Sequence, residues 1–353
     1  HALAASLAAT IAALPAARSI RPTVKPVGVP PAQDARDIGP PPLAAHGRDP
    51  DRPDHPLRRA AGELLLDLPL DDGRQRPDLV VVVGDVNSTM AATLAAVKLG
   101  VKVAHLEAGL RSFDRTMPEE INRIVTDSLA DLLWTPSPDG DENLIKEGVP
   151  LHKIQRVGNI MIDSLEMLRS RIEKEKSFER YGLKPGGYGL VTLHRPANVD
   201  EPDLLREICR ILQRVAKQIP LTFPVHPRTH KSLAKFGLWD DLQSISALHL
   251  TDPISYIPFM NLIFHCRFVL TDSGGIQEET TYLGIPCLTL RPNTERPITV
   301  TQGTNRLCTL RDVERQIGSI LTQTTAQKTV PDLWDGQSAK RICVSIQRIL
   351  LCE

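Results

Sequence analysis

The sequence predicts an α/β protein of two Rossmann-like, doubly wound domains that face a cleft, with the first domain incomplete. Apolar β-branched runs, typical of strands buried in a parallel sheet, alternate with segments of helical length. The alternation occurs in two blocks, and a charged, Gly- and Pro-containing stretch near 173–187 separates them. The expected domains are 76–172, to which the final helix 338–351 is assigned, and 173–337.

Residues 1–75 differ in composition from the rest of the chain. They hold 12 of the 29 prolines and no Phe, Trp, Tyr, Cys, Asn or Met. Short helices are expected at 2–14 and 57–68, with a Pro-rich stretch between them that forms neither helix nor sheet ladder. We expect a disordered Ala/Pro-rich segment here. It has no basic leader and does not read as a signal peptide.

The first block opens with Leu-Val-Val-Val-Val at 79–83, the strongest strand signal in the chain. Pro118 at a first helical position, with two glutamates in the first turn, starts a later helix that is expected to run to residue 133. In order, we expect a strand at 79–83, a helix at 88–99, a strand at 101–105, the helix at 118–133, a helix near 142, a strand near 154–157 and a helix from about 160.

The second block repeats this alternation. Ligands of such sheets bind at the carboxyl ends of the strands, so residues that follow strands are the first candidates for a site. The expected strands are 189–193, 221–225, 248–250, 268–271 and 286–290. The expected helices are 202–218, 229–236, 254–264, 276–283, 313–322 and 338–351.

The charges balance, with 42 Lys plus Arg against 42 Asp plus Glu. Nucleic acids and membrane surfaces both favour excess positive charge, so the balance argues against either partner. The six cysteines form no C-x-x-C pair, which favours buried, reduced thiols in a cytoplasmic protein over zinc or disulfides. No apolar run approaches the roughly 18 residues that span a bilayer.

Three acidic side chains lie in loops at one rim of the first predicted sheet. Asp85 follows the first strand, Glu107 follows the second within a string that ends at Arg111, and Glu119 opens the helix that starts at Pro118. Clustered carboxylates raise one another's pKa, and such a set suits removal and return of a carbon-bound proton. Each also has a structural alternative: a helix cap for Asp85, a surface ion pair for Glu107 and an ordinary helix start for Glu119.

Two histidines follow strands of the second block. His194 precedes Arg195 directly, and His226 precedes Arg228 by two residues. Arginine binds phosphate oxygens bidentately, so each string suits a phosphate site. A lone histidine is more often structural, so each string alone fits either a phosphate site or a structural histidine.

The strongest local site signal is Thr-Asp-Ser-Gly-Gly-Ile-Gln-Glu-Glu, which ends at Glu279. A strand ends here and a helix begins at Gly274 and Gly275, whose bare N–H groups and helix dipole form an anion site. Ser273 adds a hydroxyl donor, Glu279 lies within reach of ribose hydroxyls, and Arg296 follows the next strand. The combination favours a nucleotide-diphosphate site over a tight turn with a capped helix.

Together these strings resemble the non-hydrolysing UDP-N-acetylglucosamine 2-epimerase family. No single string is specific, but six of them occur here in the family's order, over about 76–351. The strings are Gly-Asp-Val-Asn-Ser-Thr, His-Leu-Glu-Ala-Gly-Leu-Arg, Met-Pro-Glu-Glu-Ile-Asn-Arg, His-Arg-Pro, Asp-Ser-Gly-Gly-Ile-Gln-Glu-Glu and Thr-Glu-Arg-Pro.

The resemblance implies a GT-B type fold and reversible inversion at carbon 2 of UDP-N-acetylglucosamine, giving UDP-N-acetylmannosamine. It implies that UDP leaves by anti elimination to a 2-acetamidoglucal and is re-added after reprotonation on the other face. It further implies that no metal or redox cofactor takes part and that the protein is a homodimer. By matching strings, it gives acid/base roles to Asp85, Glu107 and Glu119. It places His194 near the departing diphosphate and assigns substrate binding to Arg111, His226, Ser273, Gly274, Gly275, Glu279 and Arg296.

Residues 1–75 depart from the family pattern. They lack the string Gly-Thr-Arg-Pro-Glu, whose arginine reaches the diphosphate in the family, and the lysine soon after it. A shifted reading frame in GC-rich DNA would account for this composition. The alternatives are therefore a catalytically impaired UDP-sugar-binding protein and an epimerase of another UDP-2-acetamido sugar. A GT-B glycosyltransferase is less favoured, because it does not require the three carboxylate strings.

Overall fold

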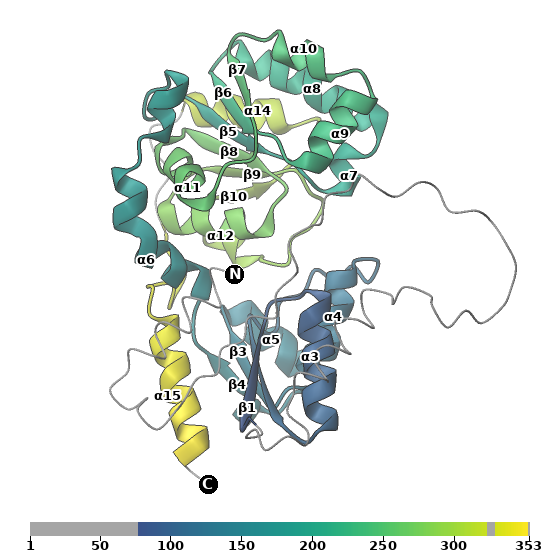
Figure 1. The fold of residues 1–353 in the computed structure, drawn as a ribbon, viewed down its shortest axis with the longest axis vertical. Coiled ribbons are helices and arrows are strands. Elements are labelled where there is room, and N and C mark those ends of the chain that lie inside the picture. Colours follow the sequence, from purple (N-terminus) through teal and green to yellow (C-terminus); the bar gives the residue numbers. More distant parts are fainter. Residues whose placement is uncertain (1–76, 323–328, 352–353) are drawn as a thin grey trace, which may run out of the picture.

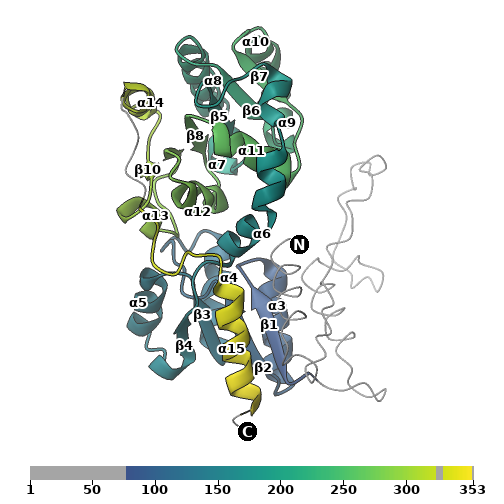
Figure 2. The same cartoon turned by 90° about the vertical axis from the view of Figure 1, so that its left-hand side faces the viewer.

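The computed structural model describes residues 77–322 and 329–351. The helices expected at 2–14 and 57–68, and Cys352, lie outside these residues. The described chain forms two lobes, each built on a parallel sheet with helices packed against it (Figures 1 and 2).

The first lobe contains a parallel sheet in the order β1-β2-β3-β4. Its Leu-Val-Val-Val-Val strand is present as predicted and pairs with β2 along its whole length, but it lies at the edge of the described sheet and only its Val82 is buried. The elements are β1 (Leu79–Val83), α3 (Asn87–Lys98), β2 (Lys102–Leu106), α4 (Pro118–Leu129), β3 (Leu132–Thr135), α5 (Pro138–Lys146), a 3-10 turn (Leu151–Lys153) and β4 (Ile154–Arg156).

One helix is shorter than the sequence predicts. The helix expected over 118–133 ends at Leu129, and the two leucines after Asp131 belong to β3. The Asp131 carboxylate accepts a hydrogen bond from the Val103 N–H at 2.9 Å, and the Asp131 N–H donates to the Val103 carbonyl at 2.8 Å. This long-range pairing with β2 ends the helix and starts the next strand.

The second lobe contains a six-stranded parallel sheet in the order β10-β9-β8-β5-β6-β7. Its strands are β5 (Gly189–Thr192), β6 (Leu221–Pro224), β7 (Leu248–Thr251), β8 (Phe268–Thr271), β9 (Cys287–Thr289) and β10 (Asn305–Leu307). Its helices are α7 (Pro196–Val199), α8 (Pro202–Ala216), α9 (Pro227–Lys235), α10 (Trp239–Gln243), α11 (Tyr256–His265), α12 (Gly274–Leu283), α13 (Ile298–Thr301) and α14 (Val313–Thr322), preceded by a 3-10 turn (Ser177–Tyr181). The sequence did not predict β10 or the short helices α7, α10 and α13.

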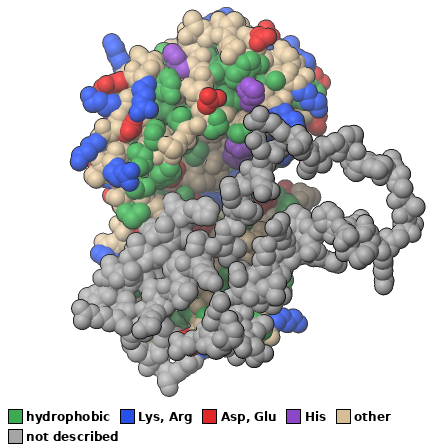
Figure 3. All heavy atoms as spheres, viewed as in Figure 1, with side chains coloured by type: hydrophobic (Ala, Val, Ile, Leu, Met, Phe, Trp, Pro, Cys, Tyr) green, Lys and Arg blue, Asp and Glu red, His purple; other side chains and the backbone are tan. Residues whose placement is uncertain are grey.

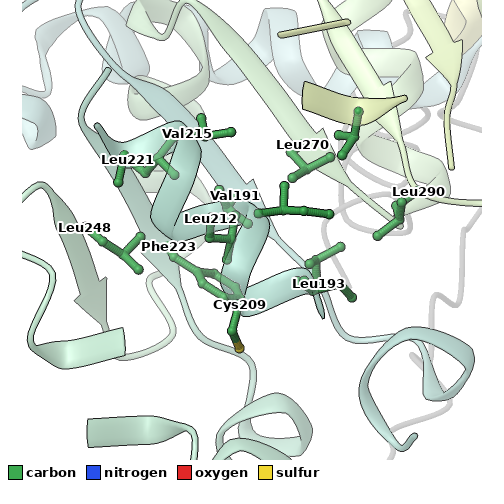
Figure 4. Close-up of a cluster of buried hydrophobic side chains, with 14 of the residues drawn as sticks. Val191, Leu193, Cys209, Leu212, Val215, Leu221, Phe223, Leu248, Leu270 and Leu290 are labelled. Atoms are coloured by element: carbon green, nitrogen blue, oxygen red, sulfur yellow. The ribbon is translucent and has the colours of Figure 1, made fainter. Parts of the chain in front are cut away.

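The core of the second lobe forms between α8 and the sheet. Figure 4 shows Cys209, Leu212 and Val215 of α8 beside Val191 and Phe223 of the strands, and all five are buried. Each such side chain contributes about 1.5–3 kcal/mol when fully buried. The packed sheet gives fixed positions to the loops at the carboxyl ends of its strands.

Two helices link the lobes. α6 (Ile160–Lys174) begins in the first core with Ile160 and then contributes Leu165 and Ile172 to a cluster of the second lobe. α15 (Ser338–Leu351) packs Ile342 against the first sheet and lies along it in Figure 2. The indole N–H of Trp134, on β3, donates to the Ser345 hydroxyl of α15 at 3.0 Å.

Ser345→Ala is expected to lower the free energy of unfolding by about 1–3 kcal/mol, because the buried Trp134 N–H then lacks an acceptor. Urea unfolding followed by circular dichroism measures the change. Val344→Ala is the matched control, since Val344 is the neighbouring, half-exposed residue of the same helix. Equal unfolding free energies for the two variants would show that the hydrogen bond does not hold α15 to the sheet.

The distribution of charged side chains and of cysteines in the described residues agrees with the composition. On the face in Figure 3, acidic and basic side chains of the second lobe are interspersed with apolar and His side chains. No helix among the described residues is both long and apolar enough to cross a bilayer. The five described cysteines are buried, as predicted: Cys209, Cys266, Cys287, Cys308 and Cys343.

Candidate active site

Two predicted carboxylates lie side by side at the carboxyl ends of β1 and β2. A Cβ atom on Gly84 would lie 3.8 Å from Oε2 of Glu107, so Glu107 is next to the residue that precedes Asp85. The Asp85 carboxylate accepts from Nη1 of Arg123 at 2.5 Å, and its backbone carbonyl accepts from Asn122 at 2.8 Å. Asp85 is therefore fixed from α4 at both its side chain and its backbone.

Glu107 itself has a left-handed backbone, with φ of 72°. This conformation costs energy in a residue with a Cβ atom, and such residues cluster at functional sites. The side chain is partly buried behind this turn. The turn thus holds a carboxylate at the rim of the sheet at an energetic cost.

The third predicted carboxylate, Glu119, is exposed in the first turn of α4. Burial and the charge of Arg291 lower the pKa of Arg195 in the second lobe, whereas Glu119 opposes that shift. Glu119 therefore lies within electrostatic reach of the other lobe. The adjacent Glu120 is buried and instead holds the preceding loop, accepting from the Ser112 N–H at 2.9 Å.

The predicted anion site opens α12, as the sequence indicates. Ser273 is the N-cap residue and its hydroxyl makes no capping hydrogen bond. A Cβ atom on Gly274 would lie 2.6 Å from Nη1 of Arg296 and 2.7 Å from Oε1 of Glu295. Only glycine lets the Arg296 guanidinium lie this close to the helix start, where Gly275 follows in the first turn.

Arg296 is held by two buried carboxylates. Its Nε lies 2.8 Å from Oε2 of Glu278, and its Nη1 donates to Oε1 of Glu295 at 2.6 Å. Glu295 also accepts from Nη2 of Arg291 at 2.8 Å. Burial by itself raises the pKa of Glu295, but Arg296 and Arg291 lower it well below its usual range. The site thus contains a pre-formed chain of alternating charges.

His194 is oriented by Asp272, which is buried at the end of β8. The His194 N–H donates to this carboxylate at 3.0 Å, and Nδ1 of the ring lies 3.0 Å from it. Burial raises the pKa of Asp272, yet hydrogen bonds from His194 and Asn198 outweigh it and lower the pKa. The His226 ring is exposed and lies 5.4 Å from the His194 ring, centroid to centroid.

Glu279 is buried and accepts a hydrogen bond from the Tyr256 hydroxyl at 2.8 Å. Burial and the adjacent charge of Glu278 raise the pKa of Glu279 to about 7. Near neutral pH this carboxyl is therefore present in both protonation states. One oxygen has Tyr256 as partner, and the predicted contact with ribose hydroxyls stays a prediction.

The two lobes meet around Glu107. Burial and the charges of Glu278 and Asp85 raise the pKa of Glu107 to about 7, whereas the charge of Arg296 acts to lower it. Glu278 and Arg296 belong to the second lobe, so Glu107 lies within electrostatic reach of both lobes. The amide of Asn159, at the start of α6, donates to Glu278 at 2.9 Å and joins the lobes directly.

Arg111 takes no part in this meeting point. Its guanidinium is buried, lies 2.7 Å from the Asp127 carboxylate, and donates to Glu147 at 2.7 and 2.8 Å. All three contacts are within the first lobe. They hold Arg111 in the packing of its loop, and its predicted contact with substrate stays a prediction.

Several residues of the site were not singled out from the sequence. Glu278 lies beside the predicted Glu279, and Glu295 beside the predicted Arg296, so the strings contained both. What the strings do not show is which of two adjacent acids faces the guanidinium, because this depends on helix register and on the opposite lobe. Asp272 stood in the string directly before Ser273, but the string does not show that it accepts hydrogen bonds from the loop of His194.

Comparison with known proteins identifies the family. The family model for UDP-N-acetylglucosamine 2-epimerase matches residues 54–347, so the match begins earlier than the resemblance at residue 76. A UDP-N-acetylglucosamine 2-epimerase of Methanococcus maripaludis is 40% identical over 70% of this chain and 69% of that protein. The UDP-2,3-diacetamido-2,3-dideoxy-D-glucuronate 2-epimerase of Pseudomonas aeruginosa is 39% identical over 78% of this chain and 75% of that protein.

The fold agrees with these relatives. The structure of the Methanocaldococcus jannaschii UDP-GlcNAc 2-epimerase in complex with UDP-GlcNAc and UDP matches with a TM-score of 0.73 at 36% identity, covering 85% of this chain and 83% of that one. The two-lobed α/β fold is thus of the GT-B type, as expected. The chain belongs to the UDP-N-acetylglucosamine 2-epimerase family, and is an enzyme of the isomerase class.

Proposed function

We propose that this chain catalyses reversible epimerisation at carbon 2 of UDP-N-acetylglucosamine, giving UDP-N-acetylmannosamine. The observation that carries the proposal is the position of Glu107, a carboxyl with a pKa of about 7, within electrostatic reach of Arg296 beside the α12 helix start. A carboxyl that exchanges protons near neutral pH suits a carbon-bound proton. A helix start with an arginine suits the diphosphate.

The reaction proceeds by elimination and re-addition. A carboxylate removes the carbon 2 proton, and the electron pair left behind forms the carbon 1–carbon 2 double bond of a 2-acetamidoglucal. The bond from carbon 1 to the UDP oxygen breaks, and its electrons leave with UDP. The return step adds the same oxygen to carbon 1 while a carboxyl delivers a proton to the opposite face of carbon 2.

Inversion needs proton-transferring groups on both faces of carbon 2. Asp85 and Glu107 come from neighbouring strand ends, and Glu119 comes from α4 on the same lobe. We assign the acid/base steps to these three, with Glu107 as the group whose pKa fits proton exchange at neutral pH. Proton transfer by positioned groups contributes about 10²–10⁴-fold to rate.

The departing UDP gains negative charge, which the second lobe is built to receive. Arg296, the N–H groups at Gly274 and Gly275, and the Asp272-held His194 supply donors that strengthen as charge develops. Ser273 and His226 lie beside them and are assigned to the same phosphates. We assign Glu279 to the ribose. A homodimer and a cytoplasmic location stay predictions.

A related substrate is the second candidate. The Pseudomonas aeruginosa relative is named for a UDP-diacetamido uronate, and its identity of 39% is close to the 40% of the UDP-N-acetylglucosamine enzyme. Both sugars carry the acetamido group on carbon 2, the carbon that loses its proton in the elimination. The proposed chemistry is the same for both, and the substrate is decided by experiment.

Incubation of the chain with UDP-N-acetylglucosamine in heavy water is expected to place deuterium at carbon 2, with UDP-N-acetylmannosamine formed in parallel. Proton NMR follows both, and a reaction with the diacetamido uronate runs beside it. Tight UDP binding without exchange of either sugar would instead favour an impaired binding protein. Sugar transfer to an acceptor without exchange would identify a glycosyltransferase.

A further inference from the structure

A buried histidine below the two carboxylates has an acceptor at each ring nitrogen. His105, on β2, is fully buried. Its Nδ1 lies 2.6 Å from Oδ1 of Asp127 on α4, and its Nε2 lies 3.0 Å from the Gly84 carbonyl at the end of β1. A neutral imidazole has one donor and one acceptor, so it satisfies only one of these two contacts.

The surroundings fix which partner donates. A backbone carbonyl only accepts, so Nε2 carries a hydrogen. Asp127 accepts from the Gly109 N–H at 3.0 Å and lies 2.7 Å from Nη1 of Arg111, which is the arrangement of an ionised carboxylate. Burial by itself raises the pKa of Asp127, but His105 and Arg111 outweigh it and lower the pKa. Nδ1 therefore also carries a hydrogen.

The charged groups that face the ring come from three elements. Asp127 on α4 is in contact, Glu107 follows β2 and acts at longer range, and Arg111 faces the far side of Asp127. Burial lowers the pKa of His105, yet Asp127, the Gly84 carbonyl and Glu107 outweigh it and raise the pKa. The raised pKa of His105 agrees with the hydrogen-bond geometry, in which both ring nitrogens face acceptors.

We infer that His105 is an imidazolium throughout the working pH range and is a positioning residue for the reaction. Its two N–H groups join the end of β1, which carries Asp85, to α4, and its positive charge lies beneath Glu107. The inference rests on the proposed function for its kinetic consequence, but not for the ionisation itself. His105 does not touch substrate in this assignment and acts through Gly84 and Glu107.

The ionisation is measured on the unaltered chain. Nitrogen-15 NMR of the histidine rings in the full protein is expected to show His105 with both ring nitrogens protonated at pH 7 and still protonated at pH 8. The ring of the exposed His152 serves as the reference in the same spectra. A His105 ring with one unprotonated nitrogen at pH 7 would overturn the inference, whether or not the chain exchanges the carbon 2 proton.

The consequence is measured with His105→Gln, which keeps one donor but removes the charge, and with His152→Gln as the matched control. We expect the rate of carbon 2 exchange at saturating substrate to fall about tenfold or more, with UDP affinity unchanged. The pH at which exchange changes should move upward, because His105 lowers the pKa of Glu107. If His105→Gln folds and its pH profile does not move, His105 does not act on Glu107 through its charge. If the variant does not fold, the NMR measurement alone decides whether His105 is ionised.

Discussion

In the Glu107→Gln variant, exchange of the carbon 2 hydrogen with solvent is expected to fall by about 10²–10⁴-fold while UDP binding is retained. Glutamine keeps the size and the hydrogen-bonding oxygen of the side chain but transfers no proton. The diphosphate contacts assigned to Arg296 and the α12 helix start are left unchanged. The measurement pairs deuterium incorporation with calorimetric titration of UDP.

The free energy of unfolding is an internal control for the Glu107→Gln variant. Glu107 has a pKa of about 7 in the folded chain, above the ordinary glutamate value of 4.5. A carboxyl whose pKa rises on folding favours the folded state at low pH, and this contribution is lost as pH rises from about 4.5 through 7. Glutamine carries no such dependence, so Glu107→Gln should match or exceed the unaltered chain in unfolding free energy at pH 8.

The exposed Glu142 on α5 is the matched comparison, since Glu142→Gln removes a carboxylate of the same lobe whose ion pair, among the described residues, is with surface Lys146. Exchange and UDP affinity should both be unchanged there. Exchange at the original rate in Glu107→Gln would remove this residue from the acid/base set. Loss of UDP binding together with exchange would assign it to the diphosphate site.

Most strands could be predicted because their signal lies within each strand, whereas β3 and β10 were not predicted. A β-branched run such as Leu79–Val83 predicts a strand from its own residues alone. The end of α4 could not be predicted, because the leucines around Asp131 fit helix and strand spacing alike. Only the pairing of Asp131 with Val103, 28 residues away, separates the two.

The sequence strings predicted which residues lie at the site, but not which residues each of them contacts. Glu107 and Arg296 each stood in a recognisable string, and the structure brings them within electrostatic reach. Arg111 stood in the same string as Glu107, yet it turns into its own lobe to pair with Asp127. The direction of a long side chain depends on the charges that the fold places around it, and these come from α4 and α5.

The second large effect is expected from Arg296→Met, which should lower the free energy of unfolding by about 3–5 kcal/mol at pH 8. Methionine fills a similar volume but leaves Glu278 and Glu295 buried without their shared cation. Both carboxylates are almost fully buried. Loss of a charged donor to the diphosphate should also weaken UDP binding by about 10- to 100-fold.

The pH dependence separates charge from packing in this variant. Burial already raises the pKa of Glu278 in the folded state, and removal of Arg296 raises it further, whereas Arg291 still lowers the pKa of Glu295. The folded variant then gains stability as pH falls and its carboxyls bind protons, so the destabilisation should be smaller at pH 5 than at pH 8. A deficit that does not change with pH would point to lost packing.

Arg214→Met is the matched control, because Arg214 lies in the same lobe and pairs with Glu314 and Glu207 at the surface. Exposed pairs of this kind contribute about 0–1 kcal/mol, since water screens both charges. Adding Glu278→Gln to Arg296→Met should recover part of the stability but none of the UDP affinity, because it removes the carboxylate that loses its cation while Glu295 keeps Arg291. Recovery of both would mean that Arg296 acts on UDP only by neutralising Glu278, and it would no longer be a diphosphate ligand.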